Sequence, residues 1–224
     1  NFINRNNKLL SDTWYDTVYD FSNGYAIVLL RHKYNFIDKN GKLISNMWFD
    51  DMDIFYYGCA KVRLNNKWNF VDTNGKLISD TWFKYVAHFD EGYARVQLDN
   101  KWNLIDTHGK LISDMWFDGV GYFYEGYARV LLNKKLNLID KNGKLISDTW
   151  FDDVENFSDG YARVLLNNKF NFVDKNGKCI SDTWFDRVDK FYHGYARVKL
   201  NRKCNLIDKN GNFISDTWYD YVDD

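Results

Sequence analysis

Apolar and polar residues alternate along short stretches of the chain, and each stretch is bounded by a turn rich in glycine or asparagine. Residues 93–98 alternate small or aliphatic side chains with polar ones, which is typical of a β-strand with one buried face. Residues 102–106 and 111–113 form two further short runs of β-forming residues. Glycine turns interrupt every window of roughly 10 to 15 residues in which a helix could form. The pattern therefore predicts β-structure throughout.

The pattern repeats with a period of 34 residues and no insertion or deletion. A Ser-Asp-X-Trp motif, once Ser-Asn-X-Trp, marks this period with Trp14, Trp48, Trp82, Trp116, Trp150, Trp184 and Trp218. A Gly-Tyr-Ala motif, or a close variant, marks it with Gly24, Gly58, Gly92, Gly126, Gly160 and Gly194. We predict one repeat domain over 1–224, divided into a partial unit 1–23, full units 24–57, 58–91, 92–125, 126–159 and 160–193, and a last unit 194–224.

Two hairpin loops are predicted in each unit. We expect three residues in each, as in 99–101 and 107–109, with the second loop closed by a glycine of positive φ. This register predicts one apolar face formed by Ala94, Val96, Leu98, Trp102, Leu104 and Ile112. The opposite face also carries Ile105 and Leu111, so we expect neighbouring units to stack and to bury both faces in part. The segment 116–123 is interpreted as either a fourth strand or a packed connection.

The predicted fold class is all-β, with tandem 34-residue β-hairpin or three-stranded repeats stacked as an open solenoid or superhelix. A closed ring or propeller-like toroid is the alternative. Propeller blades usually need about 40 residues for four strands. In addition, residues 1–20 and 205–224 are copies of the same half of the unit, whereas a ring closed by its termini needs complementary halves. Both points favour the open array.

The units resemble the WG repeat, a bacterial β-strand repeat. Its pattern is a Gly-hydrophobic-Ala strand, a polar turn, Lys-Trp-Gly-hydrophobic-Ile-Asp and a Lys-X-Gly-Lys turn, and the best matches are residues 67–72 and 101–106. The Trp-Gly pair is Trp-Asn here, and other units place Tyr34, Leu136, Phe170 or Cys204 at the tryptophan position. The resemblance covers the whole chain and implies a β-repeat used as an interaction scaffold. It carries no catalytic residue to this chain.

Composition narrows the classes of partner. The 224 residues include no proline, 19% aromatic residues and 30 basic against 31 acidic side chains, for a net charge of −1. Because both signs are dispersed, no surface dedicated to nucleic acid or anionic membranes is expected. We expect a soluble chain without signal peptide, transmembrane segment or membrane insertion, in an undetermined compartment.

No candidate catalytic or metal site recurs in the units. Cys59, Cys179 and Cys204 occupy three different positions of the repeat, and the four histidines occupy four. The Asp-Lys-Asn-Gly loops lack the glutamate and the glycine position of a helix-loop-helix calcium site. We therefore predict no enzyme activity, no cofactor and no metal.

Repeated aromatic and basic residues are open to two interpretations. The tryptophans and tyrosines are interpreted as shared core, with a ladder that binds sugars or choline-like amines as the alternative. A basic ladder is interpreted as a strand face paired with aspartates rather than an anion track; it comprises Lys61, Arg95, Arg129, Arg163 and Arg197.

Positions that differ between units are expected to be exposed and to carry specificity. The candidate partner-binding rim comprises Tyr56, Tyr57, Tyr85, Glu91, Tyr124, Glu125, Arg187, Tyr192 and His193. The predicted function is a non-enzymatic scaffold for protein–protein interaction or structural assembly. Binding of a carbohydrate or choline-like ligand through the repeated aromatics is the alternative.

Overall fold

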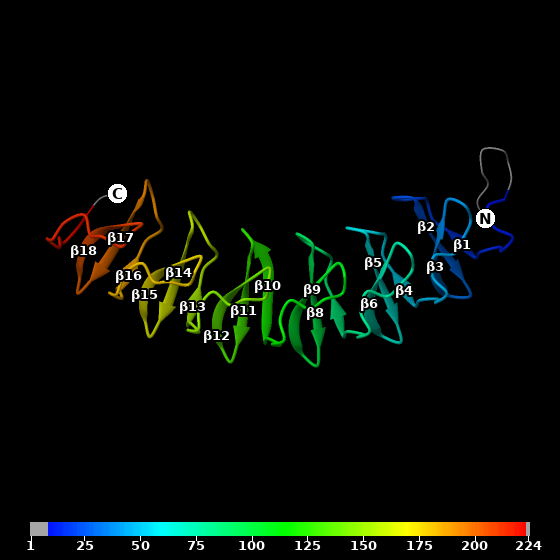
Figure 1. The fold of residues 1–224 in the computed structure, drawn as a ribbon, viewed down its shortest axis with the longest axis horizontal. Coiled ribbons are helices and arrows are strands. Elements are labelled where there is room, and N and C mark those ends of the chain that lie inside the picture. The colour runs from blue at the N-terminus through cyan, green and yellow to red at the C-terminus, as the bar shows by residue number, and fades with distance from the viewer. Residues whose placement is uncertain (1–8, 223–224) are drawn as a thin grey trace. The chain divides into compact units, whose positions relative to one another are not determined.

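The regular structure of residues 9–222, taken from a computed structural model, is entirely β (Figure 1). Six antiparallel three-stranded sheets follow one another along the chain, each formed by three consecutive strands. Among the described residues no sheet closes into a barrel. The all-β class and the tandem three-stranded repeats are confirmed. The first eight residues of the predicted partial unit 1–23 lie outside the described part.

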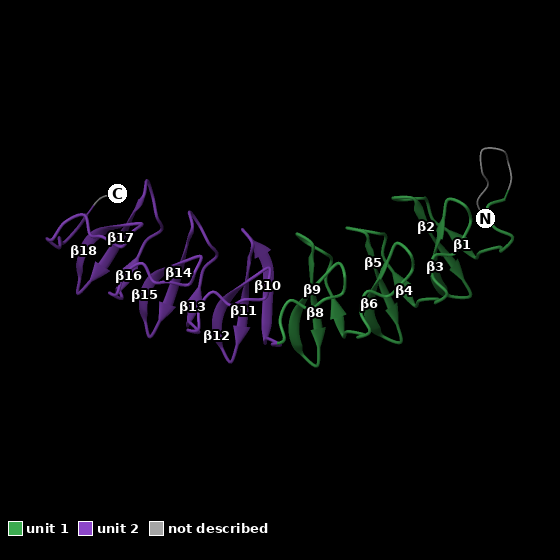
Figure 2. Ribbon diagram, in the orientation of Figure 1, with its two compact units in different colours: residues 1–114 green, residues 115–224 purple. Residues whose placement is uncertain are grey.

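The chain divides into two compact units, residues 1–114 and 115–224 (Figure 2). Unit 1 contains the strands β1 (Thr17–Val18), β2 (Tyr25–Leu30), β3 (Lys33–Asp38), β4 (Asp51–Met52), β5 (Cys59–Leu64), β6 (Lys67–Asp72), β7 (Tyr85–Val86), β8 (Tyr93–Leu98) and β9 (Lys101–Asp106). Unit 2 contains β10 (Gly119–Tyr124), β11 (Tyr127–Leu132), β12 (Lys135–Asp140), β13 (Asp153–Val154), β14 (Tyr161–Leu166), β15 (Lys169–Asp174), β16 (Arg187–Val188), β17 (Tyr195–Leu200) and β18 (Lys203–Asp208).

The first hairpin loop of each repeat has two residues, so the predicted three-residue loop 99–101 is wrong. Leu98 pairs with Lys101, and only Asp99 and Asn100 lie between the strands, both with positive φ (48° and 64°). Two positive φ values in succession define the type I′ turn, whose twist matches that of the flanking strands. The second loop does have three residues: Asp106 donates its backbone N–H to Lys110 O (2.9 Å), and Gly109 has a φ of +87°.

The shorter loop changes the register and therefore the faces. Ala94 is opposite Ile105 and Val96 is opposite Asn103, while Trp102 and Leu104 lie on the other face. The predicted apolar face of Ala94, Val96, Leu98, Trp102, Leu104 and Ile112 is thus wrong. Burial on both faces is confirmed, because three consecutive residues of β9, 103 to 105, are buried.

The segment after the three-residue loop connects each sheet to the next. Phe49 exchanges two backbone hydrogen bonds with Tyr34 of β3 (2.8 and 2.9 Å), and Asp50 donates its backbone N–H to Arg63 O of β5 (2.8 Å). The connector therefore runs from the outer edge of one sheet to the first edge of its successor. In the segment 116–123, residues Gly119–Tyr124 form β10, which is the first strand of the following sheet and not a fourth strand of the sheet before it.

A buried asparagine in every third strand holds the connector in place. The Asn35 side chain donates from Nδ2 to Ser45 O (2.8 Å) and Met47 O (3.0 Å), and its Oδ1 accepts the Phe36 N–H (2.8 Å). The same position is at most 2% exposed in all six sheets, as Asn35, Asn69, Asn103, Asn137, Asn171 and Asn205. Each buried carboxamide therefore pairs peptide groups of the connector that lie outside the strand ladders.

The glycine of the three-residue loop contacts the backbone of the preceding repeat. A Cβ added to Gly177 would lie 1.6 Å from Ile146 O, and one added to Gly75 would lie 2.0 Å from Ile44 O. Their φ values are +78° and +79°. Glycine is thus required twice here, for its positive φ and for the close approach of two repeats.

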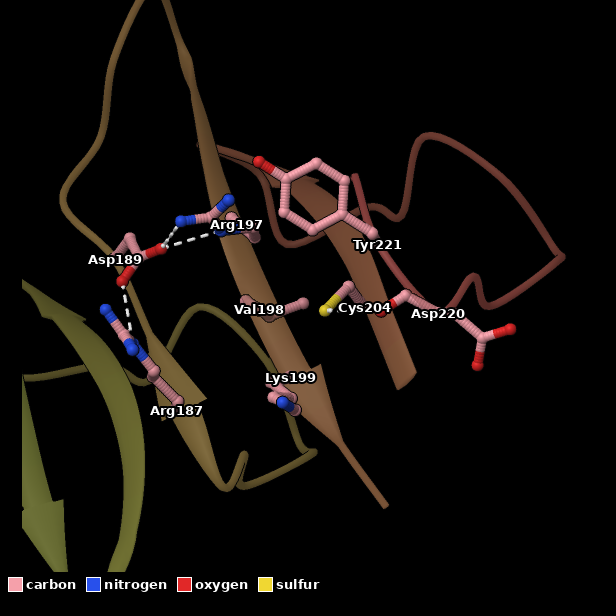
Figure 3. Close-up of a pocket in the computed structure, with 8 residues that line it drawn as sticks. All are labelled: Arg187, Asp189, Arg197, Val198, Lys199, Cys204, Asp220 and Tyr221. Carbon is pink, nitrogen blue, oxygen red and sulfur yellow. Dashed lines mark hydrogen bonds and ion pairs between the residues drawn. The ribbon is translucent and has the colours of Figure 1, made fainter. Parts of the chain in front are cut away.

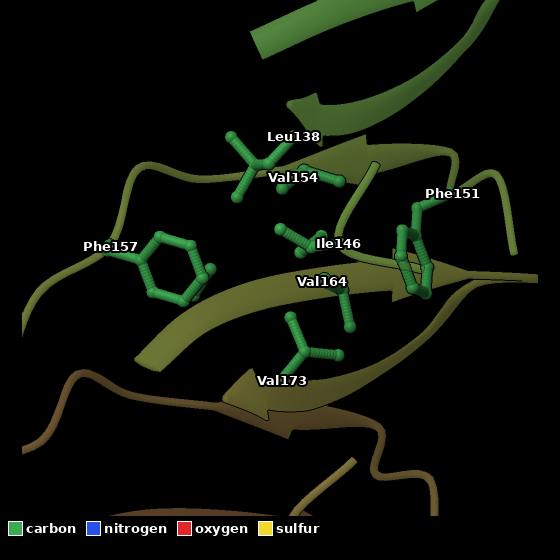
Figure 4. Packing of buried hydrophobic residues seen from close by; sticks show 8 residues of the cluster. Leu138, Ile146, Phe151, Val154, Phe157, Val164 and Val173 are labelled. Carbon is green, nitrogen blue, oxygen red and sulfur yellow. The ribbon is translucent and has the colours of Figure 1, made fainter. Parts of the chain in front are cut away.

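Three of the hydrophobic clusters lie between successive sheets of one unit. One cluster combines Leu138 of β12, Phe151 of the connector, and Val154, Val164 and Val173 of the following sheet (Figure 4). Phe151 is 1% exposed, and the phenylalanines at the same position in four other repeats are no more exposed. A single three-stranded sheet cannot enclose these side chains, so neighbouring repeats stabilise each other.

Replacing the buried asparagine should be costly. We expect Asn137→Ala to lower the free energy of unfolding by about 3 kcal/mol, because two backbone carbonyls and the Leu138 N–H lose their partner and a cavity is left at a fully buried position. Urea denaturation followed by circular dichroism measures the loss. The control is Asn142→Ala at an exposed loop position; equal effects of the two variants would contradict the role of the buried carboxamide.

Two glycines of positive φ separate backbone strain from close packing. Gly160→Ala, with φ +88° and nothing within 4 Å of the added Cβ, should cost only about 1 kcal/mol. Gly177→Ala should cost about 3 kcal/mol or more, because the methyl group also displaces the Ile146 backbone. Denaturant midpoints of the two variants test this difference, and identical midpoints would show that the contact between repeats is unimportant.

Candidate binding surfaces

The hairpins place two kinds of turn at opposite ends of every sheet. At the end we call the glycine end, X-Gly turns such as Tyr57-Gly58 lie beside the three-residue loops, because Cys59 pairs with Asp72. At the other end, which we call the asparagine end, lie the two-residue loops such as Asn65-Asn66. Side chains on both kinds of turn point away from the cores that join the sheets.

All nine residues of the predicted rim are exposed, but they do not form one site. Seven lie at the glycine end: Tyr56, Tyr57 and Glu91 in unit 1, and Tyr124, Glu125, Tyr192 and His193 in unit 2. The other two, Tyr85 and Arg187, lie on the short first strands β7 and β16, away from these turns.

Aromatic and acidic side chains are close together at the glycine end of unit 1. The rings of Tyr56 and Tyr57 meet edge to face with centroids 4.6 Å apart. Tyr56 raises the pKa of Tyr57, and the carboxylates of Asp90 and Glu91 on the next turn raise it further. Tyr57 thus remains a neutral hydrogen-bond donor next to negative charge.

The glycine end of unit 2 has a related arrangement. Tyr192 packs on His193 with ring centroids 4.1 Å apart, and Lys175 lies 4.0 Å from a carboxylate oxygen of Glu125. Tyr161 donates its hydroxyl proton to Lys209 O (2.7 Å), which ties one repeat's hairpin to the next repeat's loop. This hydrogen bond holds the turns that carry the exposed side chains in place.

The residue before the glycine has a positive φ in all six X-Gly turns, and at Tyr57 and His193 this residue carries an aromatic ring. Their φ values are 51° and 47°, in the left-handed region that favours glycine and asparagine. Asn23 occupies the same position of the first turn with a φ of 51°. A ring side chain at such a position carries a conformational cost that asparagine avoids.

The repeated tryptophans are half-buried, apart from Trp14, which is 68% exposed. Trp82 and Trp184 pack on the core clusters, while the phenylalanine that follows five of the seven tryptophans, such as Phe83, is fully buried. The basic ladder has acidic partners: Lys61 contacts Asp53 (3.3 Å), and Arg129 contacts Asp153 (3.1 Å).

A cavity of about 200 Å³ lies beside the last sheet (Figure 3). Asp189 accepts hydrogen bonds from Arg197 Nε (2.8 Å) and Arg187 Nε (3.1 Å). Burial raises the pKa of Asp189, but these arginines outweigh it and lower the pKa overall. Arg197 also donates to Val222 O, as Arg163 does to Val188 O one repeat earlier. The charges of this cavity therefore serve contacts between repeats.

Lysine–aspartate pairs join successive sheets at the asparagine end. Asp152 accepts hydrogen bonds from Lys135 Nζ and from the backbone N–H of Asn167, and both lower its pKa. Asp186 has the same partners one repeat later, Lys169 and Asn201, and its pKa is also lowered. Each aspartate thus fixes a two-residue loop and links it to the preceding sheet.

Reactive groups do not converge in the described structure. The three cysteines are free thiols, and burial raises the pKa of Cys59 to about 11, so that it stays protonated. Among residues 9–222, no group of three or more histidine, cysteine or acidic residues is placed to hold a metal ion. This same part of the chain contains no helix long and apolar enough to span a membrane.

Comparison with known proteins identifies the repeat. A family model described as "WG containing repeat" matches residues 2–34, 36–68, 70–102, 104–135, 138–170 and 172–204. No curated protein matches the chain.

Solved structures share little with the chain. Kluyveromyces lactis Hsv2 is 11% identical, with 87% of this chain and 75% of that chain covered at a TM-score of 0.33. A structure titled as the eukaryotic initiation factor is 11% identical, with 86% and 63% covered at a TM-score of 0.41. At these TM-scores the likenesses carry no argument about this chain.

The lowered aspartate pKa values predict an acid-sensitive structure. The stabilisation by Asp152 and Asp186 is present above their unfolded pKa of about 3.8, and it is lost as the pH falls through the lowered folded values. The double variant Asp152→Asn/Asp186→Asn should therefore show a flatter fall of Tm below about pH 4. Calorimetry across this range tests the prediction. Asp148→Asn at an exposed connector position is the control, and an equal flattening there would contradict it.

Proposed function

The chain belongs to the WG-containing repeat family, and on that premise we propose that it is a non-enzymatic scaffold that binds a protein partner through the glycine ends of its sheets. The single observation that carries the proposal is the set of exposed ring side chains held on left-handed turn residues. Tyr57, with a φ of 51°, is 56% exposed, and His193, with a φ of 47°, is also exposed. Neither packs into a core that would account for its size.

Composition of the glycine end suits protein recognition. Tyrosine is enriched in protein interfaces, because its rigid ring covers a large area and its hydroxyl forms hydrogen bonds. Tyr56 and Tyr57 lie beside the carboxylates of Asp90 and Glu91, so a partner with an exposed basic and apolar surface fits best. Rigid hairpins reduce the ordering cost of binding.

The alternative function, carbohydrate or choline-like ligand binding, needs accessible aromatic faces. Half-burial of most motif tryptophans limits the area that a ladder could offer. One observation favours a saccharide at a single place, where Trp82 lines an open cavity at the asparagine end.

Tyr57→Asn separates binding from stability. Asparagine is preferred over tyrosine in the left-handed region, so Tm should stay the same or rise. Affinity for the partner should fall about tenfold, as for an interface residue of central importance. The partner is first captured from source cells by a photoreactive phenylalanine at position 56 and then purified for calorimetric titration.

A photoreactive residue at position 85, an exposed tyrosine on β7 away from the glycine-end turns, is the control for capture. An adduct of defined mass should form from position 56 and not from position 85. Equal adducts from both positions, or unchanged affinity of the Tyr57→Asn variant for the purified partner, would refute the proposal.

A further inference from the structure

One repeat breaks the lysine–aspartate pattern of the asparagine end. Six repeats carry aspartate directly after the Trp-aromatic pair, as Asp16, Asp50, Asp118, Asp152, Asp186 and Asp220. The third repeat has Lys84 there instead. In the second repeat, Asp50 accepts hydrogen bonds from Lys33 Nζ and from the Asn65 N–H (2.7 Å), and Lys84 can accept neither kind of bond.

A second substitution accompanies the first. The two-residue loop that follows begins with Asp99, where four other repeats have asparagine. Lys84 Nζ donates to Asn100 Oδ1 of this loop (2.6 Å). Lys67 is the equivalent of Lys33 and Lys135, each of which forms an ion pair with the aspartate 17 residues later. The residue 17 positions after Lys67 is Lys84. Two lysines therefore occupy the positions that form an ion pair in other repeats, and both line the same cavity.

A cavity of about 380 Å³ lies at this break, entirely within unit 1. Its lining includes Lys67, Trp82, Lys84 and Asp99. The loops 65–66 and 99–100 add three asparagine side chains, so carboxamides surround the charged groups. A volume of several hundred Å³ is in the range of small-molecule sites.

The lining defines the chemistry of a ligand. Lys67 and Lys84 attract an anion, and Asp99 reduces the net charge of the lining to +1, which suits a single carboxylate better than a phosphate dianion. The indole of Trp82 can stack on the C–H face of a sugar ring. Asparagine carboxamides and the Asp99 carboxylate can pair with hydroxyl groups.

We propose that this cavity binds a uronic acid unit of an acidic saccharide, with its carboxylate between Lys67 and Lys84 and its ring against Trp82. The site lies at the asparagine end and is independent of the protein partner proposed for the glycine end.

Calorimetric titration with the trisaccharide of galacturonic acid tests the site in the whole chain. The decisive variant is Lys84→Asp/Asp99→Asn, which copies Asp50 and Asn65 of the preceding repeat and restores an ion pair for Lys67. Binding should weaken about tenfold or more, since a charge-assisted bond is lost. Its Tm should equal or exceed that of the unchanged protein, so a loss of binding cannot be attributed to unfolding.

Three comparisons complete the experiment. Lys110→Gln, which has the same change of net charge at an exposed loop, should bind the trisaccharide as before, as should Tyr57→Asn at the glycine end. The neutral galactose trisaccharide and inorganic phosphate should each bind at least about tenfold more weakly than the acidic trisaccharide. The proposal would be overturned if the galacturonate trisaccharide did not bind, or if the double variant bound it as tightly as the unchanged protein. It would also be overturned if the galactose trisaccharide or phosphate bound as tightly as the galacturonate trisaccharide.

Discussion

The carboxamide of one asparagine in each third strand is the interaction on which the other contacts depend. The connector between sheets has peptide groups that lie beyond the reach of regular strand pairing. Asn69 supplies the missing donor, from Nδ2 to Ser79 O (2.8 Å) and Thr81 O (3.1 Å). Trp82 and the core phenylalanine Phe83 directly follow those carbonyls, so the bond fixes the position at which the next core begins.

Fixed contacts in sequence also account for the constant period. The asparagine binds carbonyls 10 and 12 residues downstream, and the loop glycine Gly177 touches Ile146 of the preceding repeat, 31 positions earlier. An inserted residue in the connector would move Phe151 out of its core, and one near the loop would remove the glycine from its contact. One contact to residues later in the chain and one contact to the preceding repeat thus limit each repeat to a single length.

The sequence pattern was sufficient for the period, the all-β class and the glycine-closed loop, because these depend on local turn chemistry and repetition. It failed on the first loop, although Asn65-Asn66 is itself a signal for a two-residue type I′ turn. The invariable asparagine within an apolar strand was a second signal of a buried polar contact. The cavity beside Trp82 could not be predicted, because it depends on how two successive sheets meet.

Departures from the repeat are therefore the best guide to the function of such a chain. Six of the seven copies of this position carry aspartate, so the fold does not require the lysine found in the third repeat. We therefore attribute Lys84 to function and not to folding. The same reasoning holds for Tyr57 and His193, whose left-handed turns are built at lower cost with Asn23 in the first repeat. The repeated residues explain stability. We assign specificity to the few exposed positions at which one repeat carries a residue that stabilises the fold less than its counterpart in other repeats.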